Sequence, residues 1–304
     1  AQGCSDPPIQ DDPRLEGYNV EQRASLLANE LKERALAYNV NDILYPFGSD
    51  FQWENADTNY KNMDKLMKHM NANTEQYGMQ LIYSTPDQFV NAVHANNVNY
   101  TVKTDDFFPY ADQPHAFWTG YLTSRPALKG YVRSRGAFLR ATQGLLSTTR
   151  MSHQDMDWLS LMPNIRRLQE AQAIAQHHDA VAGTEKQHVA DDYAKRLSIG
   201  SDETAYAANV MLNTLSGLNH SSRDLVYHMC PLSNVSLCPS TSVLSPSNPV
   251  LVSIHNPLAV ARDEYVYVAV PNGRYLVSSA SGENLPTSTV PAFGTASKQA
   301  NSSP

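Results

Sequence analysis

Met79-Gln-Leu-Ile-Tyr-Ser-Thr-Pro-Asp87 joins a short apolar run to the start of a helix. Its first six residues predict a buried strand, Thr85 is a good N-cap, and Pro86 suits the first helical position. The same order occurs earlier, where the apolar run Asp42-Ile-Leu-Tyr-Pro46 precedes helical spacing in residues 54–71. Strand, helix, strand and helix in succession predict a parallel α/β architecture.

Two further regions have the spacing of helices. In residues 20–38, Ala24, Leu27 and Leu31 recur on one face, which indicates an amphipathic helix. From Ser124 onward, turn residues separate four longer helical segments at 124–147, 164–177, 186–197 and 203–218. We therefore expect residues 119–220 to form a helical bundle that packs on the α/β part.

The chain changes character again after about residue 240, where Ser, Pro, Asn and Thr separate short β-type runs. These runs are residues 250–254, 264–270 and 274–278. Alternation of valine with tyrosine in the second run is typical of a half-buried strand and predicts the start of a β-sandwich. The expected division is an α/β part at 1–118, a helical bundle at 119–220, and a linker with the start of the β-sandwich at 221–304.

Composition bounds the function. The chain has 304 residues, enough for about two domains, and 41% of them are hydrophobic, which is enough for a buried core. The net charge is −7 and no Lys/Arg block occurs, so nucleic acid is an unsuitable partner. A neutral polyol substrate is compatible with this net charge. No stretch approaches the roughly 20 apolar residues of a membrane helix, so we expect no membrane span.

Cysteines and glycosylation sequons point to an oxidising lumen. Cys230 and Cys238 flank a short turn-rich segment and are close enough to form a disulfide, which leaves Cys4 over. The alternative is three free buried thiols. The chain contains four Asn-X-Ser/Thr sequons, and the one most suited to glycosylation is Asn234, inside the expected disulfide loop.

Asp50 is the first candidate catalytic residue. It follows a predicted buried strand in Gly48-Ser-Asp50, and active sites of parallel α/β folds lie beyond the carboxyl ends of strands. A carboxyl group beside Phe47, Phe51 and Trp53 can have a raised pKa, as a general acid requires. The alternative is an ordinary helix N-cap.

Gln176-His-His-Asp179 is the second candidate, because adjacent histidines with a carboxylate can bind a metal. Neighbouring side chains on a regular helix point about 100° apart, so we expect one histidine to be a ligand and other ligands to come from elsewhere. Asp179 can then be a ligand, support a ligand or contact the substrate. The alternative is a polar helix end with solvated histidines.

The third candidate is an aromatic and acidic loop, Asp105-Asp-Phe-Phe-Pro-Tyr-Ala-Asp112, followed by His115 to Tyr121. Aromatic faces stack on the C–H side of a sugar ring, and carboxylates accept hydrogen bonds from its hydroxyls. The alternative is an apolar loop core between two domains. The carboxylates favour the functional interpretation, because burying them without partners is unfavourable.

Taken together, these segments resemble the lysosomal-type α-mannosidases of glycoside hydrolase family 38. The resemblance runs from about Cys4 to Pro257 and rests on ordered motifs, namely Gly48-Ser-Asp-Phe-Gln52, Tyr83-Ser-Thr-Pro86, the loop 105–112, Phe117-Trp-Thr-Gly-Tyr121, Ser124-Arg-Pro-Ala-Leu128, Gln176-His-His-Asp-Ala-Val181 and Gln187-His-Val-Ala-Asp-Asp-Tyr193. It implies the C-terminal part of a parallel α/β catalytic domain, a three-helix bundle and the beginning of a β-sandwich domain.

The resemblance also implies retaining hydrolysis of terminal α-mannosides in oligosaccharides, with Zn²⁺ as cofactor and a lysosomal, other secretory or extracellular location. Asp50 takes the place of the acid/base and His178 that of a zinc ligand. Asp179 takes the place of a residue that bonds mannose hydroxyls, and Trp118 looks like a wall of the substrate pocket. We expect Asp50 and His178 to face the same sugar, since retaining chemistry requires short separations.

This sequence departs from the family pattern at several points. The family's nucleophilic aspartate and remaining zinc ligands belong to an N-terminal portion of the catalytic domain that is not in this sequence, so we expect the isolated chain to be incomplete and inactive. Trp53 stands where the family often has tyrosine, and Thr142 lies where some members have a disulfide cysteine. Two alternatives stay open, a non-catalytic carbohydrate-binding relative and a structural subunit.

Overall fold

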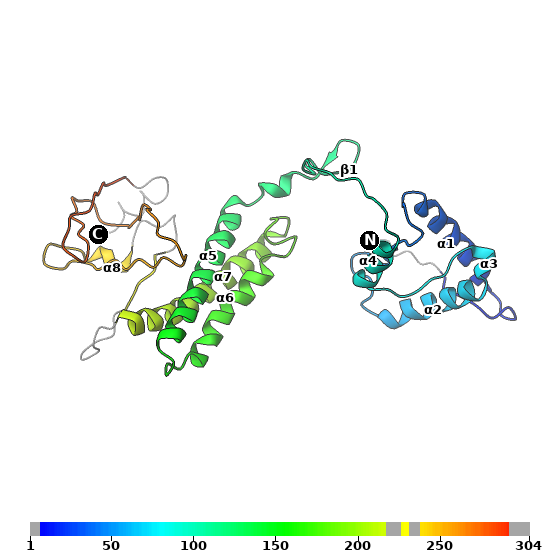
Figure 1. Cartoon of the computed structure of the whole chain (residues 1–304), viewed down its shortest axis with the longest axis horizontal. Coiled ribbons are helices and arrows are strands. Elements are labelled where there is room, and N and C mark those ends of the chain that lie inside the picture. Colours follow the sequence, from blue (N-terminus) through cyan, green and yellow to red (C-terminus); the bar gives the residue numbers. More distant parts are fainter. Residues whose placement is uncertain (1–6, 217–225, 231–237, 292–304) are drawn as a thin grey trace. The chain divides into compact units, whose positions relative to one another are not determined.

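A computed structural model describes residues 7–216, 226–230 and 238–291 (Figure 1). The chain divides into two compact units, Ala1–Asp106 and Phe107–Pro304. No helix in the described residues is both long enough and apolar enough to span a membrane.

The first unit is helical. Its helices are α1 (Val20–Ala35), α2 (Ala56–Ala72), α3 (Thr74–Tyr77) and α4 (Pro86–Ala95). The small residues Ala24 and Ala28 of α1 are buried against Met70 of α2 and Tyr77 of α3. The helices predicted at 20–38 and 54–71 are thereby confirmed, with ends that differ by a few residues.

Helix α4 begins as its sequence predicts. Thr85 occupies the N-cap with an extended backbone, and Pro86 is the first helical residue. The Thr85 amide donates a hydrogen bond to the Gln88 side chain at 3.4 Å, which satisfies a donor that the helix start leaves unpaired.

The two strands predicted in this unit are not formed, and no strand occurs in residues 7–106. A strand requires a partner for its backbone groups. At residues 79–84 a side chain takes that part, because the Asn71 amide group donates to the Leu81 carbonyl and accepts from the Leu81 N–H, both at 2.8 Å. Residues 42–46 are likewise without assigned strand structure.

The second unit contains a short hairpin and three long helices. Its elements are β1 (Ala111–Gln113), β2 (Ala116–Phe117), η1 (Gly120–Leu122), α5 (Pro126–Ser152), η2 (Leu159–Leu161), α6 (Met162–Ile174), α7 (Gln187–Ser216) and α8 (Pro239–Ser242). The two strands are antiparallel, with Ala111 opposite Phe117.

Helices α5, α6 and α7 pack along one another and enclose the main core (Figure 1). Its buried members include Val132, Leu139, Ile165, Leu168, Leu197 and Met211. Thr142 is 2% exposed within this bundle, and its hydroxyl donates to the Phe138 carbonyl at 3.0 Å. This bond lies within α5, so at Thr142 packing, and no covalent link, connects α5 to its neighbours.

The two helices predicted at 186–197 and 203–218 are one continuous helix, α7. The residues taken for a turn surround Gly200, whose missing Cβ would lie 2.7 Å from the Leu168 Cα. Gly200 therefore allows α7 to approach the backbone of α6 closely and does not end a helix.

The three strands predicted after residue 240 are not formed. Residues 238–291 contain the short helix α8 and two isolated bridges, Ser245 with Asn248 and Ser278 with Asn284. Tyr265 and Tyr267 are 91% and 88% exposed, so the alternating run has no sheet neighbour and no core to cover it here.

The predicted disulfide between Cys230 and Cys238 is confirmed, with a Cα–Cα distance of 5.7 Å. Asn234, the predicted glycosylation site inside its loop, lies outside the described residues, and so does Cys4.

Candidate functional site

The Asp50 turn, residues 46–53, has an unusual backbone. Gly48, Phe51 and Trp53 have φ values of 147°, 60° and 68°, which bulky residues adopt rarely. The Trp53 indole N–H donates to the Phe47 carbonyl at 2.8 Å and so closes the turn. This cross-link keeps Asp50 at the exposed tip.

An aromatic row, Trp53, Tyr60 and Tyr83, connects this turn to α2. Adjacent rings meet edge to face at centroid distances of 5.0 and 5.6 Å. The Tyr83 hydroxyl donates to Asp64 at 2.8 Å. Partial burial, and then the hydrogen bond to the Asp64 carboxylate, raises the pKa of Tyr83 to about 12.

The Asp50 carboxyl is exposed within its own unit, and the described residues of that unit include no hydrogen-bond or ion-pair partner for it. Phe51 is 97% exposed, so the apolar surroundings expected from the sequence are not formed there. What the unit provides is an exposed aspartate on a constrained backbone.

His177, His178 and Asp179 form a cluster in the second unit. Helix α6 ends at Ile174, three residues earlier than predicted, and residues 175–183 are turns. The two imidazole centroids are 4.3 Å apart, and each Nε2 lies 3.4 Å from the Asp179 Oδ2. The expected divergence of the histidines on a helix was therefore wrong, because they lie beyond the helix end.

This cluster has the donors of a metal site. One atom from each residue can be chosen so that all three lie within 4.8 Å of one another. Two imidazole nitrogens and a carboxylate oxygen are a typical donor set for a catalytic zinc ion, which also leaves a position open. The side chains are 49%, 85% and 50% exposed, so the cluster is accessible from solvent.

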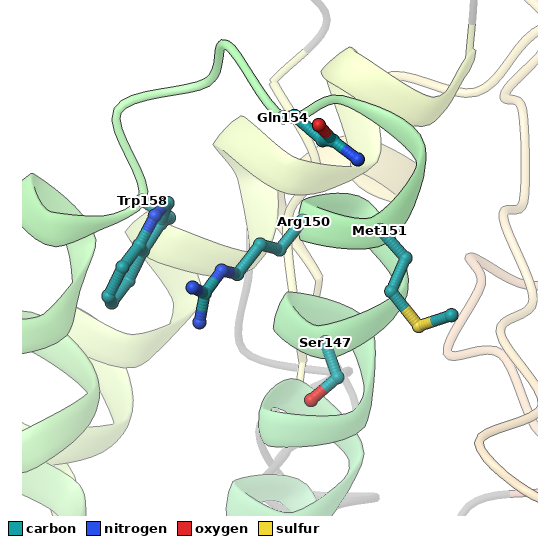
Figure 2. Close-up of a pocket in the computed structure, with 5 residues that line it drawn as sticks. All are labelled: Ser147, Arg150, Met151, Gln154 and Trp158. Atoms are coloured by element: carbon teal, nitrogen blue, oxygen red, sulfur yellow. The ribbon is translucent and has the colours of Figure 1, made fainter.

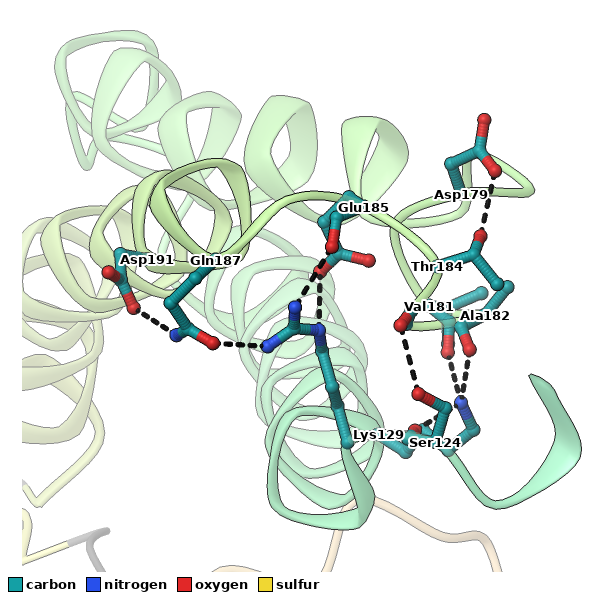
Figure 3. A network of polar contacts seen from close by, with 11 residues as sticks. Ser124, Lys129, Asp179, Val181, Ala182, Thr184, Glu185, Gln187 and Asp191 are labelled. Carbon is teal, nitrogen blue, oxygen red and sulfur yellow. Dashed lines mark hydrogen bonds and ion pairs between the residues drawn. The ribbon is translucent and has the colours of Figure 1, made fainter. Parts of the chain in front are cut away.

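Asp179 is held as an anion. The Thr184 hydroxyl donates to its Oδ1 at 2.7 Å (Figure 3). This hydrogen bond, aided by the charges of His178 and His177 and opposed by partial burial, holds the pKa of Asp179 below its usual value. A metal ligand or an acceptor for sugar hydroxyls must be deprotonated, so this environment suits both roles.

The aromatic and acidic loop forms the hairpin β1–β2 and its flanks. The Trp118 indole N–H donates to the Asp112 carboxylate at 2.9 Å, and its backbone N–H donates to the Tyr110 carbonyl at 2.9 Å. Trp118 is 54% exposed, so Asp112 orients a ring that still presents an open face. The loop is therefore not a buried core within its unit.

The structure thus brings His178 and Asp179 together, and orients Trp118 in the same unit, whereas Asp50 lies in the other unit. Sequence reasoning missed the role of Thr184 and of Lys129, which contacts the turn after Asp179. The Ser124–Leu128 motif ends one residue before Lys129, and no local pattern links it to residues about 50 positions away.

A surface depression of about 510 Å³ lies at the far end of α5 and is lined by Ser147, Arg150, Met151, Gln154 and Trp158 (Figure 2). The Arg150 guanidinium lies 4.2 Å from the centroid of the Trp158 ring. A helix the length of α5 spans about 40 Å, and the His177–Asp179 cluster adjoins its opposite end. The depression is therefore separate from this cluster.

Two family models match consecutive parts of the chain. Residues 6–113 match the glycosyl hydrolases family 38 N-terminal domain, and residues 116–215 match the alpha mannosidase middle domain. The first match contains Asp50, and the second contains Trp118 and the His177–Asp179 cluster.

Curated relatives agree with these matches. The chain is 44% identical over 284 residues to a lysosomal alpha-mannosidase of Dictyostelium discoideum, which covers 92% of the chain and 28% of the relative. It is 40% identical to a probable alpha-mannosidase of Arabidopsis thaliana, in a match that covers 94% of the chain and 27% of the relative. It is 36% identical to a lysosomal alpha-mannosidase of Cavia porcellus, in a match that covers 94% of the chain and 28% of the relative. The chain spans less than a third of the length of these relatives.

Proposed function

Because the chain belongs to glycosyl hydrolase family 38, we propose that it takes part in the retaining hydrolysis of terminal α-mannosides in oligosaccharides. The observation that carries the proposal is the order of the two family matches, with the His177–Asp179 cluster inside the second. Relatives along nearly the whole chain are named alpha-mannosidases, which supports this reaction over a carbohydrate-binding or structural role.

Asp50 is proposed as the acid/base. A retaining glycosidase needs one carboxyl that protonates the leaving oxygen and then deprotonates water. Such a group must be reachable by the substrate and by water, and Asp50 lies exposed at the tip of its turn.

On the other unit, His178 is proposed as a zinc ligand, Asp179 as the acceptor for mannose hydroxyls and Trp118 as a wall of the sugar pocket. Bound zinc would act as a Lewis acid that orients sugar hydroxyls. Asp179 is kept anionic by Thr184, and Trp118 is oriented by Asp112, so each has a fixed chemical state or direction before substrate binds.

The proposed partners are a mannose-containing oligosaccharide and an N-terminal portion of the same catalytic domain, which would supply the nucleophile and the remaining zinc ligands. The proposed domains are the C-terminal part of an α/β catalytic domain at 1–118, whose predicted strands are not formed in residues 7–106 here, the helical bundle at 119–220, and a linker with the start of a β-sandwich domain at 221–304. Names of relatives and the disulfide support a lysosomal or other luminal location.

Two substitutions in the full-length protein test the proposal. Asp50→Asn is expected to lower mannoside turnover by about 10²- to 10⁴-fold with zinc content unchanged, because it removes the proton donor. His178→Ala is expected to lower both zinc content and turnover. Turnover is measured with an aryl α-mannoside and zinc by elemental analysis.

Matched controls are Asp57→Asn on α2 and His188→Ala on α7, which change exposed residues of the same types. Neither control should alter turnover or zinc content. Full activity in Asp50→Asn would reject the acid/base assignment, and zinc retained at wild-type level in His178→Ala would reject the ligand assignment.

A further inference from the structure

The metal turn, residues 175–184, is held by internal hydrogen bonds and by bonds from another segment. Within it, the Val181 N–H donates to the Ala175 carbonyl at 3.1 Å, and the Gly183 N–H donates to the Ala180 carbonyl at 2.9 Å. The last carbonyls of α6 are bonded by residues of the same segment, such as Ile174 by the His177 N–H. The carbonyls of residues 181–183 instead receive donors from residues 124–129, at the start of α5.

Lys129 supplies most of these donors. Its ammonium group donates to the carbonyls of Val181 at 2.8 Å and Ala182 at 2.9 Å, and also to the carbonyl of Ser124 at 2.6 Å (Figure 3). An ammonium group has three N–H donors, so these three carbonyls use all of them. A single side chain therefore ties the start of α5 to the turn that follows Asp179.

Ser124 makes a second tie. Its hydroxyl donates to the Gly183 carbonyl at 2.9 Å, and a Cβ on Gly183 would lie 2.9 Å from the Ser124 carbonyl oxygen. Gly183 has a φ of +77°, which other residues adopt rarely. The two backbones are thus in direct contact at this point.

Arg125 fixes the far end of the turn. Its guanidinium donates to the Glu185 carbonyl at 2.9 Å and to the Gln187 side chain at 2.6 Å. The Glu185 side chain is 4% exposed and lies 3.6 Å from the Arg125 Nε. In the described residues this carboxylate has no hydrogen-bond partner, so the nearby guanidinium charge is what compensates its burial.

Thr184 connects these contacts to the candidate site. It follows Gly183 directly and donates to the Asp179 carboxylate, while the Ala180 N–H bonds back to the His177 carbonyl at 2.9 Å. We propose that Lys129, with Ser124 as its neighbour, is a positioning residue that sets the geometry of His178 and Asp179. The inference rests on the proposed function where it concerns zinc and turnover, and on the contacts alone where it concerns the turn.

Lys129→Met in the full-length protein tests the inference, because methionine fills similar space without donors. Hydrogen exchange in the metal-free protein should become at least about tenfold faster for amides in peptides covering residues 175–184. Zinc affinity, measured by chelator competition, and kcat should each fall by about 10- to 100-fold, the usual effect of losing a group that orients a metal ligand. Lys129→Arg should restore part of the lost exchange protection, zinc affinity and kcat.

Lys186→Met is the matched control, since Lys186 is exposed beside the same turn. Ser124→Ala should give the same pattern more weakly, which keeps the test decisive if Lys129→Met folds poorly. Unchanged exchange in residues 175–184 in both Lys129→Met and Ser124→Ala would overturn the inference, and so would faster exchange with zinc affinity and kcat unchanged. A wild-type protein without zinc or mannosidase turnover would reject the proposed function instead, while the exchange result would still decide the role of Lys129.

Discussion

The Asp50 turn and the metal turn both present a carboxylate at the surface, but they are held in different ways. One indole hydrogen bond and an aromatic row support the Asp50 turn, and they leave its carboxyl without a donor in its unit. The metal turn receives several charge-assisted and neutral hydrogen bonds, and Asp179 itself accepts one. Donors stabilise a carboxylate as an anion, so the second arrangement suits binding, whereas the first leaves its carboxyl exposed without fixing it.

Backbone strain is distributed differently as well. At the Asp50 turn, the non-glycine residues Phe51 and Trp53 have positive φ values, whereas the metal turn has its positive φ at Gly183. Strained residues persist where surrounding contacts fix them. The Asp50 turn therefore depends on its aromatic contact, and the metal turn depends on close backbone packing that only glycine permits.

The largest expected effect comes from filling the contact at Gly183. Gly183→Val should lower the free energy of unfolding of the helical bundle by about 2–5 kcal/mol, because a β-branched residue is strained at this φ and its Cβ meets the Ser124 backbone. Hydrogen exchange of α5 and α7 peptides in the full-length protein measures this quantity.

Two glycines provide controls for that experiment. Gly130→Val, on α5 with nothing near its Cβ position, should change stability by less than about 0.5 kcal/mol. Gly48→Val meets the movable indole of Trp53 and not a backbone, so it should loosen the Asp50 turn and leave the bundle unchanged. Equal bundle destabilisation by Gly130→Val and Gly183→Val would contradict the assigned contact.

Much of the helical structure was predictable, and the reasons for the errors are physical. The cap at Thr85 and the amphipathic helices follow from local sequence, so these predictions were confirmed. Gly200 was misread as part of a turn because its use is set by Leu168 on another helix. The strand predictions failed because residues such as Leu81 pair with a side chain, and sequence does not show the partner.

The candidate site likewise has parts that the sequence predicts and parts that it does not. His178 and Asp179 stand out in sequence because adjacent histidines beside an aspartate are unusual, and the structure brings their side chains together. Their supports, Lys129 and Ser124, lie more than 50 residues away from the carbonyls they bind, so no spacing rule finds them. Chemical groups were predictable here, and the contacts that orient them were not.

A smaller effect is expected from Thr184→Val, which keeps the shape of the side chain and removes the donor to Asp179. The kcat/KM for an aryl α-mannoside should fall by about tenfold, the effect of losing about one hydrogen bond, because Asp179 is the proposed acceptor for mannose hydroxyls. Steady-state kinetics measure the change, and zinc content should stay the same. Thr148→Val, on an exposed part of α5, is the matched control, and an equal loss there would mean that the effect is not local.

The next prediction tests the support of the Asp50 turn. Trp53→Phe removes the N–H that donates to the Phe47 carbonyl and should weaken the turn by about 0.5–1.5 kcal/mol. Turnover should fall by about 3- to 10-fold while zinc content stays unchanged, since the metal turn does not involve this residue. Trp158→Phe, beside the surface depression, controls for the substitution itself. Zinc loss in Trp53→Phe would show that the two turns are not independently supported.

The smallest expected effect is a pH dependence in the aromatic row. The pKa of Tyr83 is raised to about 12 from an ordinary value near 10, because partial burial and the Asp64 carboxylate disfavour its ionised form. A raised pKa contributes stability that is complete below pH 10 and is lost as the pH rises toward 12. Ultraviolet titration of tyrosinate should therefore show one fewer late-ionising tyrosine in Tyr83→Phe than in the wild type. In the wild type only, exchange of α2 amides should accelerate between pH 10 and 12 by more than the intrinsic exchange rate does. Tyr100→Phe is the control, because Tyr100 is also exposed but is not a member of the row. Identical titrations of the wild type and Tyr83→Phe near pH 12 would mean that the Tyr83–Asp64 contact does not hold the row, and that the Asp50 turn depends on the contacts of Trp53 with Phe47 and Tyr60.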